Sequence, residues 1–132
     1  MNDLQTQIAS AFLTRLDATI GRPPIAYTGF EFTPPSTGVW WRAKLFPNDS
    51  QDFLVAGEAA IQIGFFQVQV FARPGIGELG LLRSAEDVIA RFPKGLAIFN
   101  EVRVRKRPTV APVIEEDSTV NMPITIGYRG PA

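Results

Sequence analysis

The 132-residue sequence contains no cysteine and no histidine. Without cysteine the chain can form neither a disulfide nor a thiolate nucleophile, and without histidine it lacks the commonest general base and the commonest metal ligand. These absences exclude Ser-His-Asp and Cys-His catalytic arrangements and metal sites built on sulfur or imidazole. The composition is compatible only with metal sites that use oxygen ligands, such as calcium sites. The polar loop that holds Asp49 and Asp52 lacks the ligand spacing of a calcium loop. We therefore expect no enzyme, no cofactor and no bound metal.

Neither sign of charge is in excess, because 13 basic residues balance 13 acidic ones. No global field therefore attracts the chain to nucleic acid or to an anionic membrane. The first residues, MNDLQTQIAS, lack the basic and apolar regions of a signal peptide, and no apolar run is long enough to span a bilayer. The composition predicts one soluble globular domain over residues 1–132 that stays in the cytoplasm of the cell that makes it.

Two segments have the apolar spacing of amphipathic helices, residues 3–19 and residues 78–92. In the first, apolar residues recur at Ile8, Phe12 and Leu16. In the second, we expect the buried face to follow the residues Leu79, Leu82, Ala85, Ile89 and Phe92. Each helix should pack one face on a sheet.

Strand patterns cover residues 39–46, 58–73, 96–99, 102–107 and 119–128, and the third and fourth of these segments should form a hairpin around Asn100. Residues 22–38 contain four prolines and should be extended, with at most one short strand. The apolar phase of segment 58–73 switches after Phe65, which predicts a β-bulge near Gly64 and Phe65. Pro123 predicts an edge position or an interruption for the last strand.

Most of these strands alternate apolar and polar residues, so one face of the sheet should be buried and the other partly wet. Helix, strands, helix and strands follow one another along the chain. This order favours an α+β fold with a single mixed or mostly antiparallel sheet and two helices packed on one face.

The stretch FARPGIGELG, residues 71–80, contains the spacing of a dinucleotide-binding fingerprint, Gly75-x-Gly77-x-x-Gly80. A dinucleotide-binding strand is buried on both faces, whereas Gln67 and Gln69 interrupt the apolar run here. We therefore favour a strand-to-helix turn in which Pro74 and the glycines supply unusual backbone angles. A small-molecule or nucleotide-binding domain is kept as an alternative.

Two charged stretches are the candidate interface residues. Arg103, Arg105 and Arg107 alternate with Val102 and Val104, with Lys106 beside them, and one strand face should therefore carry three guanidinium groups. That face can be solvated, can contact nucleic acid, or can contact protein. The acidic residues Glu115, Glu116 and Asp117 follow about ten residues later. Opposite patches at different places on one subunit suit a head-to-tail contact that closes into a ring.

The chain resembles the tail terminator, or tail completion, proteins of long-tailed bacteriophages and prophages. The resemblance follows the chain in order, through FEFTPPSTGVWWRAKLFP, the strand and turn GFFQVQVFARPGIG, the helix end ARFPKG, and VRVRKRPTVAPVIEEDSTVNMPITIGYR. QVQVFARPGIG and FPKG are the most specific of these segments. None of them is a catalytic signature.

The resemblance implies a structural role in the neck region of the virion tail, after assembly in the host cytoplasm. Members of this family form a hexameric ring that caps the head-proximal end of the tail tube, ends polymerisation and presents the head-joining surface. The implied partners are further copies of the chain, the major tail tube protein and a head-completion or neck protein. No membrane and no sequence-specific nucleic acid is implied, although DNA can pass through the ring. Another neck component, such as a head-tail connector or head-closure protein, is the alternative.

Overall fold

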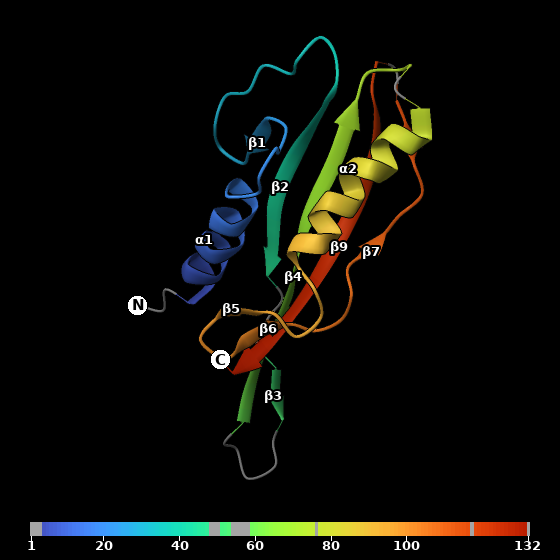
Figure 1. Ribbon diagram of the computed structural model, residues 1–132. Coiled ribbons are helices and arrows are strands. Elements are labelled where there is room, and N and C mark those ends of the chain that lie inside the picture. Colours follow the sequence, from blue (N-terminus) through green and yellow to red (C-terminus); the bar gives the residue numbers. More distant parts are fainter. Residues whose placement is uncertain (1–3, 48–50, 54–58, 76, 117, 132) are drawn as a thin grey trace.

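The computed structural model describes residues 4–47, 51–53, 59–75, 77–116 and 118–131 (Figure 1). They form two helices and one mixed sheet, which confirms the α+β prediction. Neither of these two helices is long and apolar enough to cross a membrane. The elements, in chain order, are α1 (Leu4–Asp17), β1 (Ile25–Tyr27), β2 (Val39–Pro47), β3 (Gln51–Phe53), β4 (Ala59–Ala72), α2 (Gly77–Arg91), β5 (Ala97–Phe99), β6 (Val102–Val104), β7 (Thr109–Val110), β8 (Ile114–Glu115) and β9 (Val120–Pro131).

The sheet runs in the order β1-β2-β4-β9-β6-β5, with β3 added to β4 and with β7 and β8 added to β9. All pairs are antiparallel except β1 with β2. The predicted hairpin is present as β5 and β6, and Asn100 lies in its turn with a φ of 52°. Segment 22–38, which contains the four prolines, forms one short strand before β2 begins, as expected.

The core lies between the helices and one face of the sheet (Figure 1, where α2 lies in front of the strands). Ile8, Phe12 and Leu16 of α1 are fully buried, as their spacing predicts. Phe12 stacks on Phe66 of β4 with ring centroids 4.7 Å apart. Both helices contribute to this one core, and the sheet therefore has a helix-covered face and a helix-free face.

The predicted β-bulge in β4 is wrong. Pairing with β2 and with β9 continues through Gly64 and Phe65 without a shift in register. The apolar phase switches because the two faces of β4 both carry apolar side chains. Phe66 points into the core, whereas Phe65 lies on the helix-free face, where it stacks on Phe46 at 4.8 Å between centroids.

The predicted edge position of the last strand is also wrong, because β9 lies in the middle of the sheet. Pro123 is directly opposite Gln69 of β4. Its carbonyl oxygen accepts a hydrogen bond from the backbone nitrogen of Ala111, on the other side of β9. Since the N–H and C=O of one strand residue point to the same side, the missing N–H of Pro123 faces the gap between β7 and β8. The neighbouring strand is interrupted there, and β9 itself is continuous.

The buried face of α2 differs from the predicted one by one position. Leu81, Ala85 and Val88 are buried, whereas Leu79 is 72% exposed. Leu82 and Ile89 are half-buried at the border of the core. The sequence contains a wide apolar stripe on this helix, and only packing against the twisted sheet decides which part of the stripe is covered.

The C-terminal ends of α1 and α2 are joined by two arginines. Arg15 Nε donates to the carbonyl oxygen of Arg91, and Arg91 Nη2 donates to the carbonyl oxygen of Arg15 at 2.9 Å. The last carbonyl groups of a helix lack intrahelical partners and carry partial negative charge, so each guanidinium stabilises the end of the other helix. Burial, and then the neighbouring charge of Arg91, lowers the pKa of Arg15.

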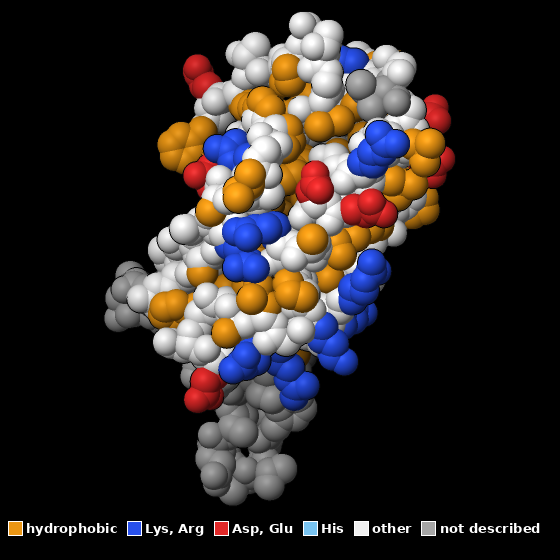
Figure 2. Space-filling model, in the orientation of Figure 1, with side chains coloured by type: hydrophobic (Ala, Val, Ile, Leu, Met, Phe, Trp, Pro, Cys, Tyr) orange, Lys and Arg blue, Asp and Glu red, His pale blue; other side chains and the backbone are white. Residues whose placement is uncertain are grey.

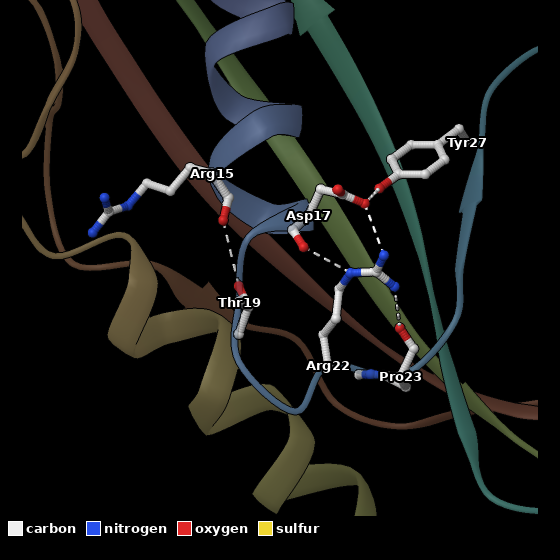
Figure 3. Close-up of polar contacts among 6 residues, drawn as sticks. All are labelled: Arg15, Asp17, Thr19, Arg22, Pro23 and Tyr27. Atoms are coloured by element: carbon white, nitrogen blue, oxygen red, sulfur yellow. Dashed lines mark hydrogen bonds and ion pairs between the residues drawn. The ribbon is translucent and has the colours of Figure 1, made fainter.

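A polar network joins the end of α1 to β1 (Figure 3). Asp17 Oδ1 accepts hydrogen bonds from Tyr27 Oη at 2.7 Å and from Arg22 Nη2 at 2.9 Å. Arg22 also donates to the carbonyl oxygens of Asp17 and Pro23 at 2.8 and 3.0 Å. The network fixes the start of segment 28–38, which borders the helix-free face of the sheet.

Candidate subunit interface

Two of the three arginines predicted to share one strand face, Arg103 and Arg105, lie at one end of the helix-free face. Val102 and Val104 of β6 are buried on the helix side, and Arg103 between them is exposed. Arg105 follows the end of β6 and still donates its backbone N–H to Gly127 at 2.9 Å. A Cβ built on Gly127 would lie 3.4 Å from Cδ of the arginine side chain. The predicted alternation thus holds for these two arginines.

Arg129 of β9 adds a third cation to this end, because it is directly opposite Arg103. We call Arg103, Arg105 and Arg129 the basic edge. Figure 2 shows Lys and Arg side chains gathered around β6 and the segment that leads to β7. Arg107 is exposed in that segment, beyond β6. The sequence pattern missed Arg129, since only the register of β9 brings it beside β6.

The acidic residues lie far from the basic edge. Glu115 of β8 and the following Glu116 are exposed, and the backbone nitrogen of Glu116 donates to Thr119 at 2.9 Å. Glu115 pairs with Val120, seven residues along β9 from the partner of Arg105, which corresponds to about 24 Å at 3.4 Å per residue. The acidic and basic groups therefore occupy opposite ends of β9.

Three further predicted interface residues are acidic. Asp49 and Asp117 lie outside the residues that the structure describes. Asp52 belongs to β3, where its backbone pairs with Ala60 of β4. In Figure 1, β3 and the first part of β4 project beyond the rest of the molecule.

The helix-free face is hollowed by a cleft of about 730 Å³. Arg42 and Lys44 of β2 and Gln67 and Gln69 of β4 form its floor, because they alternate with the buried residues of those strands. One wall comes from segment 28–34 and the other from residues 114–121, and the lining includes Phe30, Phe32, Pro34, Ile114, Glu116, Thr119 and Asn121. Cationic, amide and aromatic groups thus share one open cleft.

Two aromatic rings at the end of this floor are sandwiched between arginines. Trp40 stacks on Phe71 at 5.6 Å between ring centroids, with 9° between the planes. The Arg42 guanidinium lies 4.8 Å from the Phe71 centroid, and that of Arg73 lies 5.4 Å from the Trp40 centroid. The guanidinium groups cover the rings, which explains how Trp40 is only 3% exposed on a face without helices.

The glycine stretch forms a turn between β4 and α2. Gly75 and Gly77 have φ angles of 111° and 83°, and Gly80 lies inside α2. Both neighbours of β4 are antiparallel, whereas the dinucleotide fingerprint requires a parallel βαβ unit. Glu78 and Glu115 line the hollow of about 280 Å³ beside the turn. Their carboxylates would repel a phosphate group, so the geometry favours the turn interpretation.

The described residues provide no metal site. No three carboxylates among them lie close enough together to hold an ion. Their one ion pair is the contact between Arg22 and Asp17.

Solved structures share this fold over nearly its whole length. One is 32% identical in sequence, with a TM-score of 0.75 over 95% of this chain and 94% of its own. Another is a chain from the virion of a native gene transfer agent particle, with 13% identity and a TM-score of 0.62 over 100% of both chains. At 13% identity the likeness shows the fold alone. A comparison with curated proteins found no match.

A match to a protein-family model shows which family the chain belongs to. The model described as "Phage tail terminator protein" matches residues 7–128. The match reaches from within α1 to within β9, and it includes Arg103, Arg105, Glu115 and Glu116 of the two candidate patches. It confirms the resemblance carried by the glycine turn and its flanking segments. The chain therefore belongs to the phage tail terminator family, and it is a structural protein of the virion tail.

Proposed function

We propose that this protein forms a ring of six subunits that caps the head-proximal end of the tail tube and provides the head-joining surface. Family membership over residues 7–128 is the observation that carries the proposal. The ring acts in the neck region of the tail, after assembly in the host cytoplasm. Its partners are further copies of the chain, the tube protein and a neck protein, and the whole chain acts as one domain without catalytic activity.

The physical task of such a ring is to end an open assembly. Each ring of a tube exposes the surface on which the next ring adds, so growth has no intrinsic stop. A terminating ring must match the tube on one side and must lack, on its other side, the surface that accepts another tube ring. A subunit with different surfaces at its two ends meets this requirement.

The charged patches support a head-to-tail contact in the ring. The basic edge and Glu115 with Glu116 lie at opposite ends of β9, so they can meet between neighbouring subunits but not within one. We assign Arg107 to the basic side, and the sequence neighbour Asp117 to the acidic side. Contacts of this type repeat around a closed ring.

Deletion of the gene tests the proposal. Tails assembled without the protein should be longer than wild-type tails or variable in length, and they should lack heads, because nothing ends tube growth or offers the joining surface. Electron microscopy of the particles measures both properties. Tails of normal length without heads would instead assign the protein to head closure. Normal-length, head-joined tails would contradict both roles.

A further inference from the structure

The outer edge of β2 is covered by β1 over only part of its length. Strand β1 pairs with β2 from Trp41 to Ala43, whereas β2 continues to Pro47. After Tyr27 the chain leaves the sheet in a turn, in which the N–H of Phe30 donates to the carbonyl oxygen of Tyr27 at 3.2 Å. In Figure 1, β1 accordingly lies beside the upper part of β2 alone. Among the described strands, none covers the last part of this edge.

The backbone of Leu45 lies on the free part of the edge. The N–H of Trp41 donates to the carbonyl oxygen of Pro24 at 2.9 Å, so the backbone groups of Trp41 point toward β1. Because these directions alternate along a strand, Ala43 and Leu45 point to the same side. The carbonyl oxygen of Ala43 accepts a hydrogen bond from Thr28 Oγ1 at 3.3 Å. No described residue bonds to the N–H or C=O of Leu45, which are therefore available to another extended chain.

An apolar hollow of about 370 Å³ lies next to this backbone. Helix α1, strands β2 and β4 and segment 27–30 form its lining, which consists of Ala9, Leu13, Tyr27, Thr28, Phe30, Ala43, Lys44, Leu45 and Phe66. Leu13 and Leu45 are only half-buried, and Phe30 is 76% exposed. Exposed apolar surface beside a free strand edge is typical of sites that bind a peptide strand, since the backbone supplies hydrogen bonds and the hollow selects a side chain.

Alternation determines which side chains a bound strand presents to this site. Leu45 packs on the core and thus points to the helix side of the sheet. A residue paired with Leu45 points to the same side and enters the hollow, and its two neighbours point to the helix-free face beside Lys44 and Phe46. Lys44 is exposed, and its Nζ lies 5.0 Å from the centroid of the Phe46 ring. A carboxylate on a neighbouring residue would therefore meet Lys44.

The described carboxylates of the subunit leave Lys44 without an ion pair. Glu116, which lines the far wall of the cleft, follows β8, and β8 is three strand spacings from β2. This separation corresponds to about 14 Å at about 4.8 Å per spacing. Glu31 lines neither the cleft nor the apolar hollow. A bound segment can thus supply the counter-charge of Lys44.

We propose that the free edge of β2 binds an extended segment of another protein, in which an apolar residue is flanked by an acidic residue. The segment pairs its backbone with Leu45, fills the hollow with its apolar side chain and places its carboxylate beside Lys44. In the virion the segment belongs to a protein that adjoins the terminator ring. That source rests on the proposed function, whereas the binding site itself does not. One short pairing gives low affinity, and repetition around a ring compensates for it.

Peptide binding to the purified full-length protein tests the site. The probe is the capped peptide acetyl-TDLDT-amide, and two comparison peptides replace its leucine by serine or its aspartates by lysines. Ala9→Phe fills the hollow from α1, and Lys44→Glu reverses the charge beside it. Ala90→Phe, at an exposed position of α2 outside the hollow, is the matched control. NMR titration gives the dissociation constants, and hydrogen exchange of the Leu45 amide reports backbone pairing.

The site predicts a specific pattern of binding. The leucine peptide should bind the wild-type protein and slow the exchange of the Leu45 amide. The serine peptide, and Ala9→Phe with the leucine peptide, should each bind about tenfold more weakly or worse, because a large apolar side chain is no longer buried. Lys44→Glu should reverse the preference between the aspartate and lysine peptides. This exposed change leaves the core packing intact, so it tests the site even where Ala9→Phe disturbs α1. The control should bind as the wild type does.

Other results would overturn the inference. Equal binding of the leucine and serine peptides, or binding without slower exchange at Leu45, would show that the peptide attaches elsewhere. A Leu45 amide that is already protected in the free protein, with self-association that Ala9→Phe abolishes, would assign the edge to a second copy of the chain. Absence of binding would show that the edge is only solvated.

Assembling tails separate the failure of this inference from the failure of the proposed function. In the deletion strain, Ala9→Phe should give fewer head-joined tails of normal length than the wild-type protein, and Ala90→Phe should give as many. Normal tails with Ala9→Phe would contradict the docking of a tail protein at this edge. Normal tails in the deletion strain itself would contradict the proposed function, and the peptide measurements would still decide the binding site.

Discussion

A contact across the sheet requires glycine at position 64. Its Cα is opposite Tyr128 of β9, and a Cβ on this residue would lie 2.4 Å from the tyrosine Oη and 2.6 Å from its Cζ. The backbone oxygen of Phe46 would be 2.9 Å away. The tyrosine is fully buried, so neither neighbour can withdraw easily. The glycine in this strand is therefore explained by a buried ring and not by a bulge.

We predict that Gly64→Ala destabilises the subunit by about 1–3 kcal/mol through overpacking. Gly127→Ala is the control, because the nearest neighbour of its Cβ is the flexible Arg105 side chain at 3.4 Å. That change should alter the free energy of unfolding by less than about 1 kcal/mol. Denaturant unfolding of both variants measures the difference. Equal effects would contradict the proposed packing of Tyr128 on Gly64.

Tyr27 makes stability dependent on pH in the alkaline range. Burial, followed by the hydrogen bond to Asp17, raises the pKa of Tyr27 to about 12. The folded state thus keeps a proton that an unfolded tyrosine loses near about pH 10. The stabilising contribution is complete below about pH 10 and is lost as the pH rises through about 12. Unfolding free energies measured between these values should fall less steeply in Tyr27→Phe than in the wild type, and parallel curves would contradict this role.

At the scale of elements, helix α2 tests which part of an apolar stripe faces the core. Leu81→Ala should destabilise the fold by about 2–5 kcal/mol, because the side chain is 1% exposed and its loss leaves a cavity. Leu82→Ala should cost less, since Leu82 is half-buried. Arg83→Ala, an exposed control, should change the unfolding free energy by less than about 0.5 kcal/mol. Equal losses at positions 81 and 83 would show that a different face of the helix is covered.

The elements themselves could be predicted because they depend on local patterns. Apolar spacing placed α1 and α2 within one or two residues of their observed ends, and alternation placed β2 and β4 equally well. The errors concern properties that depend on neighbouring strands. The position of Pro123 within the sheet, for example, is set by where β7 ends and β8 begins. Sequence spacing along β9 contains no information on that gap.

At the scale of the whole molecule, a balanced composition conceals an uneven distribution of charge. The sequence pattern identified Arg103 and Arg105 because they are two residues apart in one expected strand. It missed Arg42 and Lys44, which join the same basic face only through the pairing of β2 with β4 and of β4 with β9. A candidate interface built from several strands can therefore be recognised only when the strand order is known.

The ring contact predicts that assembly and folding respond differently to charge reversal. Arg105→Glu with Arg107→Glu should leave the melting temperature nearly unchanged, since both side chains are exposed. Exposed ion pairs contribute about 0.2–1 kcal/mol each, and repetition over the ring multiplies that small contribution. The reversed protein should therefore form rings more weakly, and added salt should weaken wild-type rings. Adding Glu115→Arg with Glu116→Arg should restore part of the assembly in sedimentation velocity. Rings that form as in the wild type would show that the basic edge is only solvated.

The most direct measurement of the central claim is the position and symmetry of the protein in the assembled particle. Cryo-electron microscopy of purified particles gives both, and the fold in Figure 1 can be fitted to the density. We predict one six-fold ring of this chain at the head-proximal end of the tail tube. Copies repeated along the tube, or a tail without this chain at its head-proximal end, would contradict the role of a tail terminator.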